Sequence, residues 1–523
     1  MELLETLQNK YRGSSEEELI AVIAKLTSEL GKLQTLLFSR GRERTASEPV
    51  GMSLLFDEVE QALTEDALAN QTEISPEEAS EEEAPPKKDG SKTSKRKSLP
   101  PHLPRRREEI DLPESEKFCQ EHKVALIKIG EEITEKLEII PAKVEVLQRV
   151  ILKYKCPCCE SKFVAAKPPP DIIPKSYATP SLLAYIATAK FVDGLPLYRQ
   201  ERIFDRYSID INRTSMARWM IRISDLVKPL LNLMHEDLMA CPVIHIDETE
   251  VLVLAEPGKL PTSKSYMWVM ARNSEHPIIL FNYEPHRSKK AALNLLPGFN
   301  GTLLCDGYKV YPSLRTDIPI KIAGCMAHVR RKFWLAEKII KKEAKQTTPI
   351  LASKALAWIK KLYAIEKEIK HREPEDILRV RQARSLPLMQ EFKAWLDGIE
   401  QRILPSSPTG KAVSYALGQW DFLLEFTKNP AVVLDNNYVE AHIRPFVVGR
   451  NAWMFSATPM GAHASAALYS LVETAKANGI DPHDYLTLIF KELPLSPDLE
   501  SLEKLLPYEA KKHFPLKQFV ASK

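Results

Sequence analysis

The stretch ValIleHisIleAspGluThr, residues 243–249, carries an acidic side chain inside an apolar run of the kind that forms a buried β-strand. Apolar residues flank Asp247, and the strand-like pattern continues beyond it, so we expect this carboxylate in the middle of a sheet. The run is expected to form a hairpin with SerTyrMetTrpValMetAla (265–271), and ProIleIleLeuPheAsnTyr (277–283) is the expected third strand.

The residues after these strands alternate between helical and strand-like patterns. A helix is expected over 288–296, and strands are expected at ThrLeuLeuCysAsp (302–306) and IleLysIleAlaGlyCysMet (320–326). From about 330 to 416 the pattern is helical and rich in lysine. Three sequential strands, a helix, a strand and then helices predict a mixed sheet flanked by helices, which is an α/β architecture.

Two further acids lie in patterns that suit a metal-bound carboxylate. Asp306 ends an apolar run at Asp-Gly, which is a turn signal. Glu440 lies in AspAsnAsnTyrValGlu (435–440), on a helix that we expect Asp435 to cap. Because the first and fourth strands of such a sheet can be neighbours, we expect Asp247 and Asp306 to meet. Two strand aspartates and one helix glutamate can hold two divalent ions, which activate a water or hydroxyl at a phosphodiester.

Each acid also has an ordinary interpretation when it is taken singly. Asp306 can be a turn residue, Asp247 can belong to a plain hairpin, and Glu440 can pair with Arg444 one turn away. The joint pattern favours the metal site, since close carboxylates repel one another unless a cation lies between them. We therefore predict two Mg²⁺ or Mn²⁺ ions at Asp247, Asp306 and Glu440.

Composition argues for an intracellular chain of several domains. The chain has 523 residues and a formal net charge of only +3, so no global field points to nucleic acid. It has seven cysteines, no apolar signal-peptide core and no apolar run long enough to span a membrane. We expect a cytoplasmic protein whose cysteines are thiols or metal ligands.

The first part of the chain predicts self-association. Apolar residues recur at alternating steps of four and three, as in a coiled-coil seam, at Leu19, Ile23, Leu26, Leu30, Leu33 and Leu37. A single amphipathic helix packed on its own protein is the alternative. Residues 43–110 form an acidic and then basic linker that we expect to be disordered. Its basic half can neutralise DNA phosphates or can simply be solvated.

Two close pairs of potential ligands lie within residues 111–166. Cys119-x-x-His122 and Cys156-x-x-Cys159, separated by a β-like stretch over 135–150, suit one tetrahedral structural Zn²⁺. Cys158 adds an ambiguity of register, and a zinc-free remnant of the same fold is the alternative.

Residues 167–240 have the pattern of a helix-turn-helix. Two helices, a short turn and a third helix that bears Arg213, Arg218 and Arg222 predict DNA contact. Three-helix packing without any role in DNA binding is the alternative.

Several residues near the acids are candidates for phosphate contact. Cys325-x-x-His328 has ligand spacing, but a lone pair is weak evidence, and core packing of Cys325 is favoured. Arginine suits bidentate phosphate binding, although capping and surface pairing are alternatives. The predicted DNA-contacting set here is His328, Arg330, Arg331, Arg444 and Arg450.

Taken together, these motifs resemble those of the insertion sequence 66 family of DDE transposases. The matching stretches lie at 36–44, 53–60, 243–249, 303–308, 323–333 and 435–456, so the resemblance spans nearly the whole chain. It implies a ribonuclease-H-like core with a helical insertion, in which Asp247, Asp306 and Glu440 match the catalytic triad. It also implies metal-dependent hydrolysis at the transposon ends, followed by attack of the freed 3′-hydroxyl on target DNA.

The resemblance extends to partners and organisation. It implies binding of terminal inverted repeats and target DNA, a zinc module that assists end binding, a bacterial DNA-associated location, a homo-oligomer, and small accessory proteins from the same element. His122 stands where the family usually has cysteine, and Met326 where tryptophan is usual. The expected segments are 1–42, 43–110, 111–166, 167–240, 241–332 (core, first part), 333–430 (helical insertion), 431–488 (core, second part) and 489–523 (tail).

Two other functions remain open on the residues alone. One is a DNA-binding regulator that combines zinc, helix-turn-helix and coiled coil with an inactive nuclease domain. The other is a nuclease of the same fold, such as a junction-cleaving enzyme. The presence of all three acids argues against the first, and the upstream modules argue against the second.

Overall fold

The computed structural model describes residues 144–155, 163–165, 167–344 and 350–514. The chain divides into two compact units, one from 59 to 168 and the other built mainly from 169 to 523. In the first unit, β1 (Lys153–Lys155) and β2 (Phe163–Ala165) pair antiparallel on either side of the Cys156–Cys159 segment. The β-like stretch expected over 135–150 has no strand in its described part, residues 144–150, where Val146 and Val150 are exposed.

A five-stranded mixed sheet organises the second unit. The strand order is β5-β4-β3-β6-β7, with β3, β4 and β5 antiparallel and with β6 and β7 parallel to β3. The bounds are β3 Val243–Leu252, β4 Lys264–Arg272, β5 Ile278–Glu284, β6 Thr302–Cys305 and β7 Lys321–Gly324. The predicted hairpin, third strand and two later strands are therefore confirmed, and β3 is central as expected.

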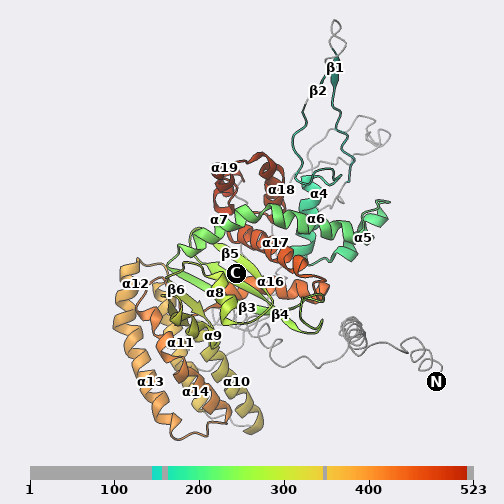
Figure 1. Ribbon diagram of the computed structural model, residues 1–523. Coiled ribbons are helices and arrows are strands. Elements are labelled where there is room, and N and C mark those ends of the chain that lie inside the picture. Colours follow the sequence, from blue (N-terminus) through green and yellow to red (C-terminus); the bar gives the residue numbers. More distant parts are fainter. Residues whose placement is uncertain (1–143, 156–162, 166, 345–349, 515–523) are drawn as a thin grey trace, which may run out of the picture. The chain divides into compact units, whose positions relative to one another are not determined.

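Four helices before the sheet share its hydrophobic core. Their bounds are α4 Pro180–Phe191, α5 Leu197–Arg206, α6 Arg213–Leu226 and α7 Lys228–Met239. Thr179 caps α4 and Asn212 caps α6 through side-chain oxygens that accept backbone N–H groups. The buried faces of α4 and α6 pack against α17 (Pro459–Ala477), so the helix-turn-helix-like segment lies against the sheet layer (Figure 1).

Helix α17 also covers the edge strand β5. Ser470 Oγ accepts from Phe281 N at 2.8 Å, and Thr474 Oγ1 accepts from Ile279 N at 3.0 Å and donates to Ile279 O at 2.9 Å. One turn further on, Asn478 Nδ2 donates to the carbonyl of Pro277. Side chains at four-residue spacing on the helix therefore take the place of a missing neighbouring strand and satisfy a buried edge.

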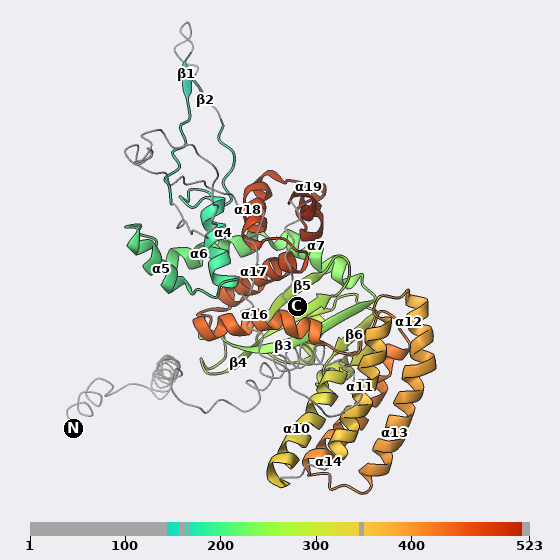
Figure 2. The same cartoon turned by 180° about the vertical axis from the view of Figure 1, so that it is seen from behind.

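A second hydrophobic core belongs to the helices between β7 and α16, which form a bundle beside the β6–β7 side of the sheet in both views (Figures 1 and 2). The bundle bounds are α10 Met326–Ala344, α11 Leu351–Ile369, α12 Pro374–Val380, η3 Arg381–Ser385, α13 Leu386–Glu400, α14 Pro408–Gly418 and α15 Trp420–Leu423. The helical character expected from 330 to 416 is confirmed for residues 330–344 and 350–416, which the structure describes.

Further helices complete the second unit. The remaining bounds are α8 Lys289–Leu295, α9 Val310–Ser313, α16 Asn437–Trp453, α18 Pro482–Glu492, α19 Leu499–Glu503 and α20 Pro507–Ala510. Residues after 489, expected as a tail, contribute Leu505, Leu506 and Ala510 to the main core. In the part of the chain that the structure describes, no helix combines the length and apolar character needed to cross a bilayer.

Candidate active site

The predicted carboxylates Asp247 and Asp306 come from neighbouring parallel strands. In the ladder between β3 and β6, His245 lies beside Leu304. The same offset carried two residues further puts Asp306, which follows the end of β6, level with Asp247. The expected pairing of the first and fourth strands is therefore confirmed, and it brings these two carboxylates to one place on the sheet.

Glu440 lies in the first turn of α16, which packs against β3. The expectation that Asp435 caps this helix is wrong. The helix begins at Asn437 and its N-cap position is Asn436, whose side chain makes no capping hydrogen bond. Asp435 lies one residue too early for that role. Its Oδ1 accepts from Asn437 N at 3.1 Å, and its Oδ2 accepts from the hydroxyl of Tyr363 at 2.9 Å.

Asn436 ties the start of α16 to the sheet instead of capping the helix. Its side chain is fully buried, its Oδ1 accepts from His245 Nδ1 at 2.9 Å, and its Nδ2 donates to Ile246 O at 3.0 Å. Its backbone N–H contacts Cys325 Sγ at 3.2 Å. Burial lowers the pKa of His245 to about 4, so this imidazole is neutral at physiological pH and Nδ1 carries its proton. The first turn of α16, with Glu440, is thereby fixed against β3.

The three acids act on one another electrostatically. Burial, followed by the charges of Glu248, Glu440 and Asp306, raises the pKa of Asp247 well above its usual range. Burial raises the pKa of Glu440 to about 7, with further contributions from Asp435 and Asp306, although Arg331 opposes the shift. Burial also raises the pKa of Asp306. Without a cation, the three carboxylates cannot all be ionised at neutral pH without a large cost.

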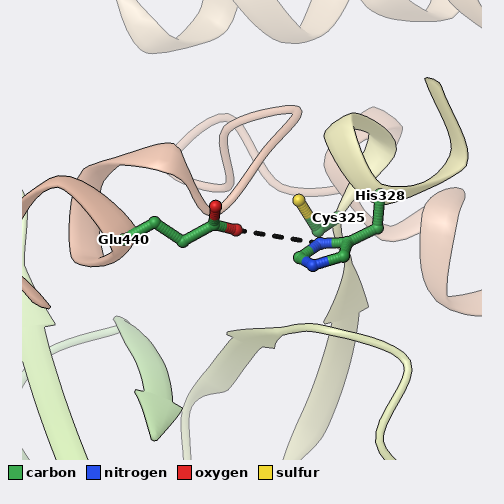
Figure 3. A group of neighbouring side chains, drawn as sticks. All are labelled: Cys325, His328 and Glu440. Carbon is green, nitrogen blue, oxygen red and sulfur yellow. Dashed lines mark ion pairs between the residues drawn. The ribbon is translucent and has the colours of Figure 1, made fainter. Parts of the chain in front are cut away.

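Two residues of α10 face the glutamate. Arg331 Nη2 lies 3.7 Å from Glu440 Oε2, and His328 Nδ1 lies 3.7 Å from Glu440 Oε1. Burial, with the charges of Arg331 and Lys332, lowers the pKa of His328 to about 3, so its imidazole is neutral. Figure 3 shows the Glu440 carboxylate directed at this imidazole, with the Cys325 sulfur beside it. Of the predicted DNA-contacting residues, His328 and Arg331 therefore lie next to the Glu440 carboxylate.

Glu248 is a further acid at the site that the sequence argument did not single out. Its side chain is 1% exposed, pairs with Arg287, and accepts from the hydroxyl of Tyr311. Arg287 in turn lies 3.6 Å from the ring centroid of Tyr308, and its positive charge partly offsets the burial that raises the pKa of Asp306. Arg287 therefore links Glu248 to the predicted metal ligands. The adjacent Asp-Glu pair in residues 243–249 was the available signal.

The donor set fits a hard divalent cation. Three carboxylates with raised pKa values share one site, and Glu440 Oε1 is buried with no hydrogen-bond partner among the described residues. Asp247 Oδ1 accepts from Glu248 N at 2.8 Å, and Asp306 Oδ1 accepts from Tyr308 N at 2.9 Å, which orients both carboxylates. Mg²⁺ prefers carboxylate and water oxygens, and its charge would remove the mutual repulsion.

The other predicted DNA-contacting residues are more dispersed. Arg213, Arg218 and Arg222 are exposed on α6, whereas the acids come from β3, the end of β6 and α16. Arg330 is exposed on α10, and Arg444 is partly buried on α16. Arg450 is engaged with the protein, because its guanidinium donates to the Glu250 carbonyl and to Thr249 Oγ1.

The predicted zinc ligands and coiled coil fall outside the described residues. These are the ligands Cys119, His122, Cys156 and Cys159 and the segment 1–42.

Family models match most of the chain. A model described as "Transposase IS66 family" matches residues 175–464, and "IS66 C-terminal element" matches 470–508. A "zinc-finger binding domain of transposase IS66" matches 117–160, which contains the predicted zinc ligands. A model described as "Transposase C of IS166 homeodomain" matches 25–107.

Two relatives match most of the chain. The chain is 33% identical over 427 residues to y4jD, an uncharacterized protein of Sinorhizobium fredii, covering 79% of this chain and 81% of that protein. It is 30% identical over 505 residues to y4qI of the same organism, covering 94% and 89%. The resemblance drawn from the sequence motifs is confirmed: the chain belongs to the IS66 family of transposases, which are of the DDE type.

Proposed function

We propose that this chain is an active DNA transposase that cleaves element ends and joins them to target DNA, with Asp247, Asp306 and Glu440 as its catalytic carboxylates. One observation carries the proposal. The β3–β6 register puts Asp306 level with Asp247, and both carboxylates act electrostatically with Glu440 on α16. Three acids from distant parts of the chain, brought to one place that is largely shielded from solvent, are the arrangement that two-metal phosphodiester chemistry needs.

The proposed core fold is ribonuclease-H-like with a helical insertion. Three antiparallel strands, two further strands parallel to the first, and helices on the sheet support this assignment. The bundle from α10 to α15 enters between β7 and α16, at the position proposed for the insertion. We retain the eight segments predicted from the sequence, from 1–42 through 489–523, as the proposed domain organisation. Leu505, Leu506 and Ala510 of the last segment pack in the main core, so this segment is proposed as part of the second unit and not as a free tail.

Two Mg²⁺ or Mn²⁺ ions held by the three carboxylates would supply an activated water or hydroxyl and would stabilise the leaving oxygen of the phosphodiester. The protein's own contribution is orientation and charge. Asn436 fixes the glutamate helix on β3, and the backbone N–H groups of Glu248 and Tyr308 orient the two aspartates. Arg331 and Arg287 bring positive charge to the same place, which suits an approaching phosphate.

DNA binding is proposed for surfaces outside the acids as well. The exposed arginines of α6 suit phosphate contact, and a zinc module at 117–160 with Cys119, His122, Cys156 and Cys159 as ligands is proposed to bind the ends. Segment 1–42 is proposed to make the chain a homo-oligomer. Terminal inverted repeats, target DNA and accessory proteins of the same element are the proposed partners.

The test uses the full-length chain with DNA that carries the cognate element ends. Asp247→Asn, Asp306→Asn and Glu440→Gln should each abolish Mg²⁺-dependent strand cleavage while end binding, measured by gel shift, is kept. Glu250→Gln is the matched control, because Glu250 is on β3 but its carboxylate pairs with exposed Lys264. Wild-type cleavage by two of the three variants would contradict the assignment. A wild-type chain that binds ends and never cuts would instead support a DNA-binding regulator.

A further inference from the structure

Three donor atoms of different chemistry converge beside the proposed magnesium site. Cys325 follows β7, His328 lies in the first turn of α10, and Glu440 lies in the first turn of α16. One sulfur, one ring nitrogen and one carboxylate oxygen from these residues all lie within 4.8 Å of one another (Figure 3). Cys325 is buried, and both other side chains are largely shielded from solvent.

Two of these atoms lack any partner that would explain their burial. His328 Nδ1 and Glu440 Oε1 are buried without a hydrogen bond among the described residues. They face each other at 3.7 Å, which is too long for a hydrogen bond. Since buried polar atoms are nearly always paired, two facing atoms without hydrogen bonds point to a cation that bridges them when the neutral His328 ring carries its proton on Nε2.

The chemistry of the set selects the kind of cation. Sulfur, imidazole nitrogen and one carboxylate oxygen suit Zn²⁺ or a similar transition metal, whereas Mg²⁺ prefers oxygen ligands throughout. Metal–ligand distances of about 2.0–2.3 Å put tetrahedral ligand atoms roughly 3.3–3.5 Å apart. The observed 3.7 Å between nitrogen and oxygen therefore needs only a small side-chain adjustment.

We propose that Cys325, His328 and Glu440 form a site for Zn²⁺ or a similar transition-metal ion, and that filling it withdraws Glu440 from the magnesium site. The second half of this statement rests on the proposed function. The Cys325 thiol loses its proton to solvent when the metal binds, and water fills the fourth position. Zinc would then slow Mg²⁺-dependent cleavage by competing for one shared carboxylate.

Metal binding is measured on the full-length chain, with Zn²⁺ and Co²⁺ as probes. The variants are Cys325→Ser and His328→Asn. Cys241→Ser is the matched control, because its buried thiol bonds to Asp237 O and Arg272 in the part of the chain that the structure describes. Equilibrium dialysis should give one zinc equivalent fewer, or affinity at least about tenfold weaker, for both site variants than for the wild type and the control. The Co²⁺–thiolate absorption should fall in Cys325→Ser, and it should also fall in His328→Asn to the extent that this variant loses the ion. Any metal at residues 117–160 is common to all four proteins and cancels in these differences.

Equal zinc content and equal cobalt spectra in the wild type and both site variants would overturn the proposed site. Circular dichroism shows whether each variant folds. If one variant misfolds, the metal content of the other variant decides whether the site exists. Cleavage is then measured at fixed Mg²⁺ with rising Zn²⁺, each variant being compared with itself without zinc. If zinc inhibits cleavage equally in the wild type and in Cys325→Ser, the proposed competition between zinc and magnesium for Glu440 is wrong.

Zinc content and cobalt spectra can be measured without any DNA cleavage. The zinc-site proposal and the proposed transposase function can therefore be refuted independently of each other. A chain that never cleaves DNA but loses one bound zinc on Cys325→Ser contradicts the proposed function alone.

Discussion

Replacing Glu440 by glutamine should stabilise the metal-free protein at alkaline pH, although it removes a proposed catalytic group. Burial raises the pKa of this carboxylate from 4.5 to about 7. The folded chain therefore holds a proton between these pH values that the unfolded chain releases, and stability falls as the pH rises through this window. At 1.36 kcal/mol per pH unit, the cost of ionising Glu440 reaches about 3 kcal/mol above pH 7. Glutamine does not ionise and avoids this cost.

The measured quantity is the difference in unfolding free energy between Glu440→Gln and the wild type. It should grow by about 3 kcal/mol in favour of the variant from about pH 4.5 to about pH 8, because groups common to both proteins largely cancel. Urea unfolding in EDTA, followed by intrinsic fluorescence, gives the values. Glu250→Gln, at a partly exposed carboxylate on β3, is the control substitution. Adding Mg²⁺ at pH 8 should stabilise the wild type and narrow the difference.

A difference that stays constant from acid to alkaline pH would refute the electrostatic reasoning, since it would mean that Glu440 titrates alike in both states. A variant that becomes relatively less stable as the pH rises would refute even its sign. In either case, burial would not disfavour the ionised form of Glu440 in the folded chain as the structure requires.

Three further substitutions test the buried contacts that hold the start of α16, the β5 edge and the helical bundle in place. Asn436→Ala leaves the His245 N–H and the Ile246 carbonyl buried without partners, so urea unfolding should show a loss of about 2–4 kcal/mol and cleavage should fall with it. Thr474→Val keeps the shape but removes both hydrogen bonds to Ile279 on the β5 edge, which should cost about 2 kcal/mol and speed amide exchange of that strand. Arg381→Leu leaves the Glu366 carboxylate inside the helical bundle without its buried partner and should lower stability by about 3–5 kcal/mol.

Local pattern was sufficient to predict the sheet. Apolar runs with turn signals between them located β3 to β7, and a helix between the third and fourth strands implied the mixed topology that is observed. The meeting of Asp247 and Asp306 could be predicted too, because it needs only that β3 and β6 be neighbours in parallel register. These features depend on the periodicity of single segments and on general rules of strand connection.

The parts that could not be predicted depend on pairs of residues distant in sequence. The two partners of the Asn436 side chain lie 190 and 191 residues away in the sequence. Local sequence therefore favoured the neighbouring Asp435 as the residue that caps α16. Gly307 was interpreted as a turn residue, yet a Cβ there would lie 2.6 Å from the hydroxyl of Tyr415, which packs over it from α14. Only the folded chain shows that the missing side chain at Gly307 lets Tyr415 of the helical bundle pack next to Asp306.

The attachment of Glu440 explains how so long an insertion can separate it from the aspartates. Met326 N donates to Leu434 O at 3.0 Å, which pins the end of the insertion to its own beginning beside β7. Asn436 then bonds to β3 before α16 begins. The position of Glu440 is therefore set by bonds to the sheet on which the aspartates lie, and the bundle between α10 and α15 need not transmit it. It follows that the bundle can vary in length or packing while the three carboxylates stay in register, provided that the bonds at Leu434 and Asn436 are kept.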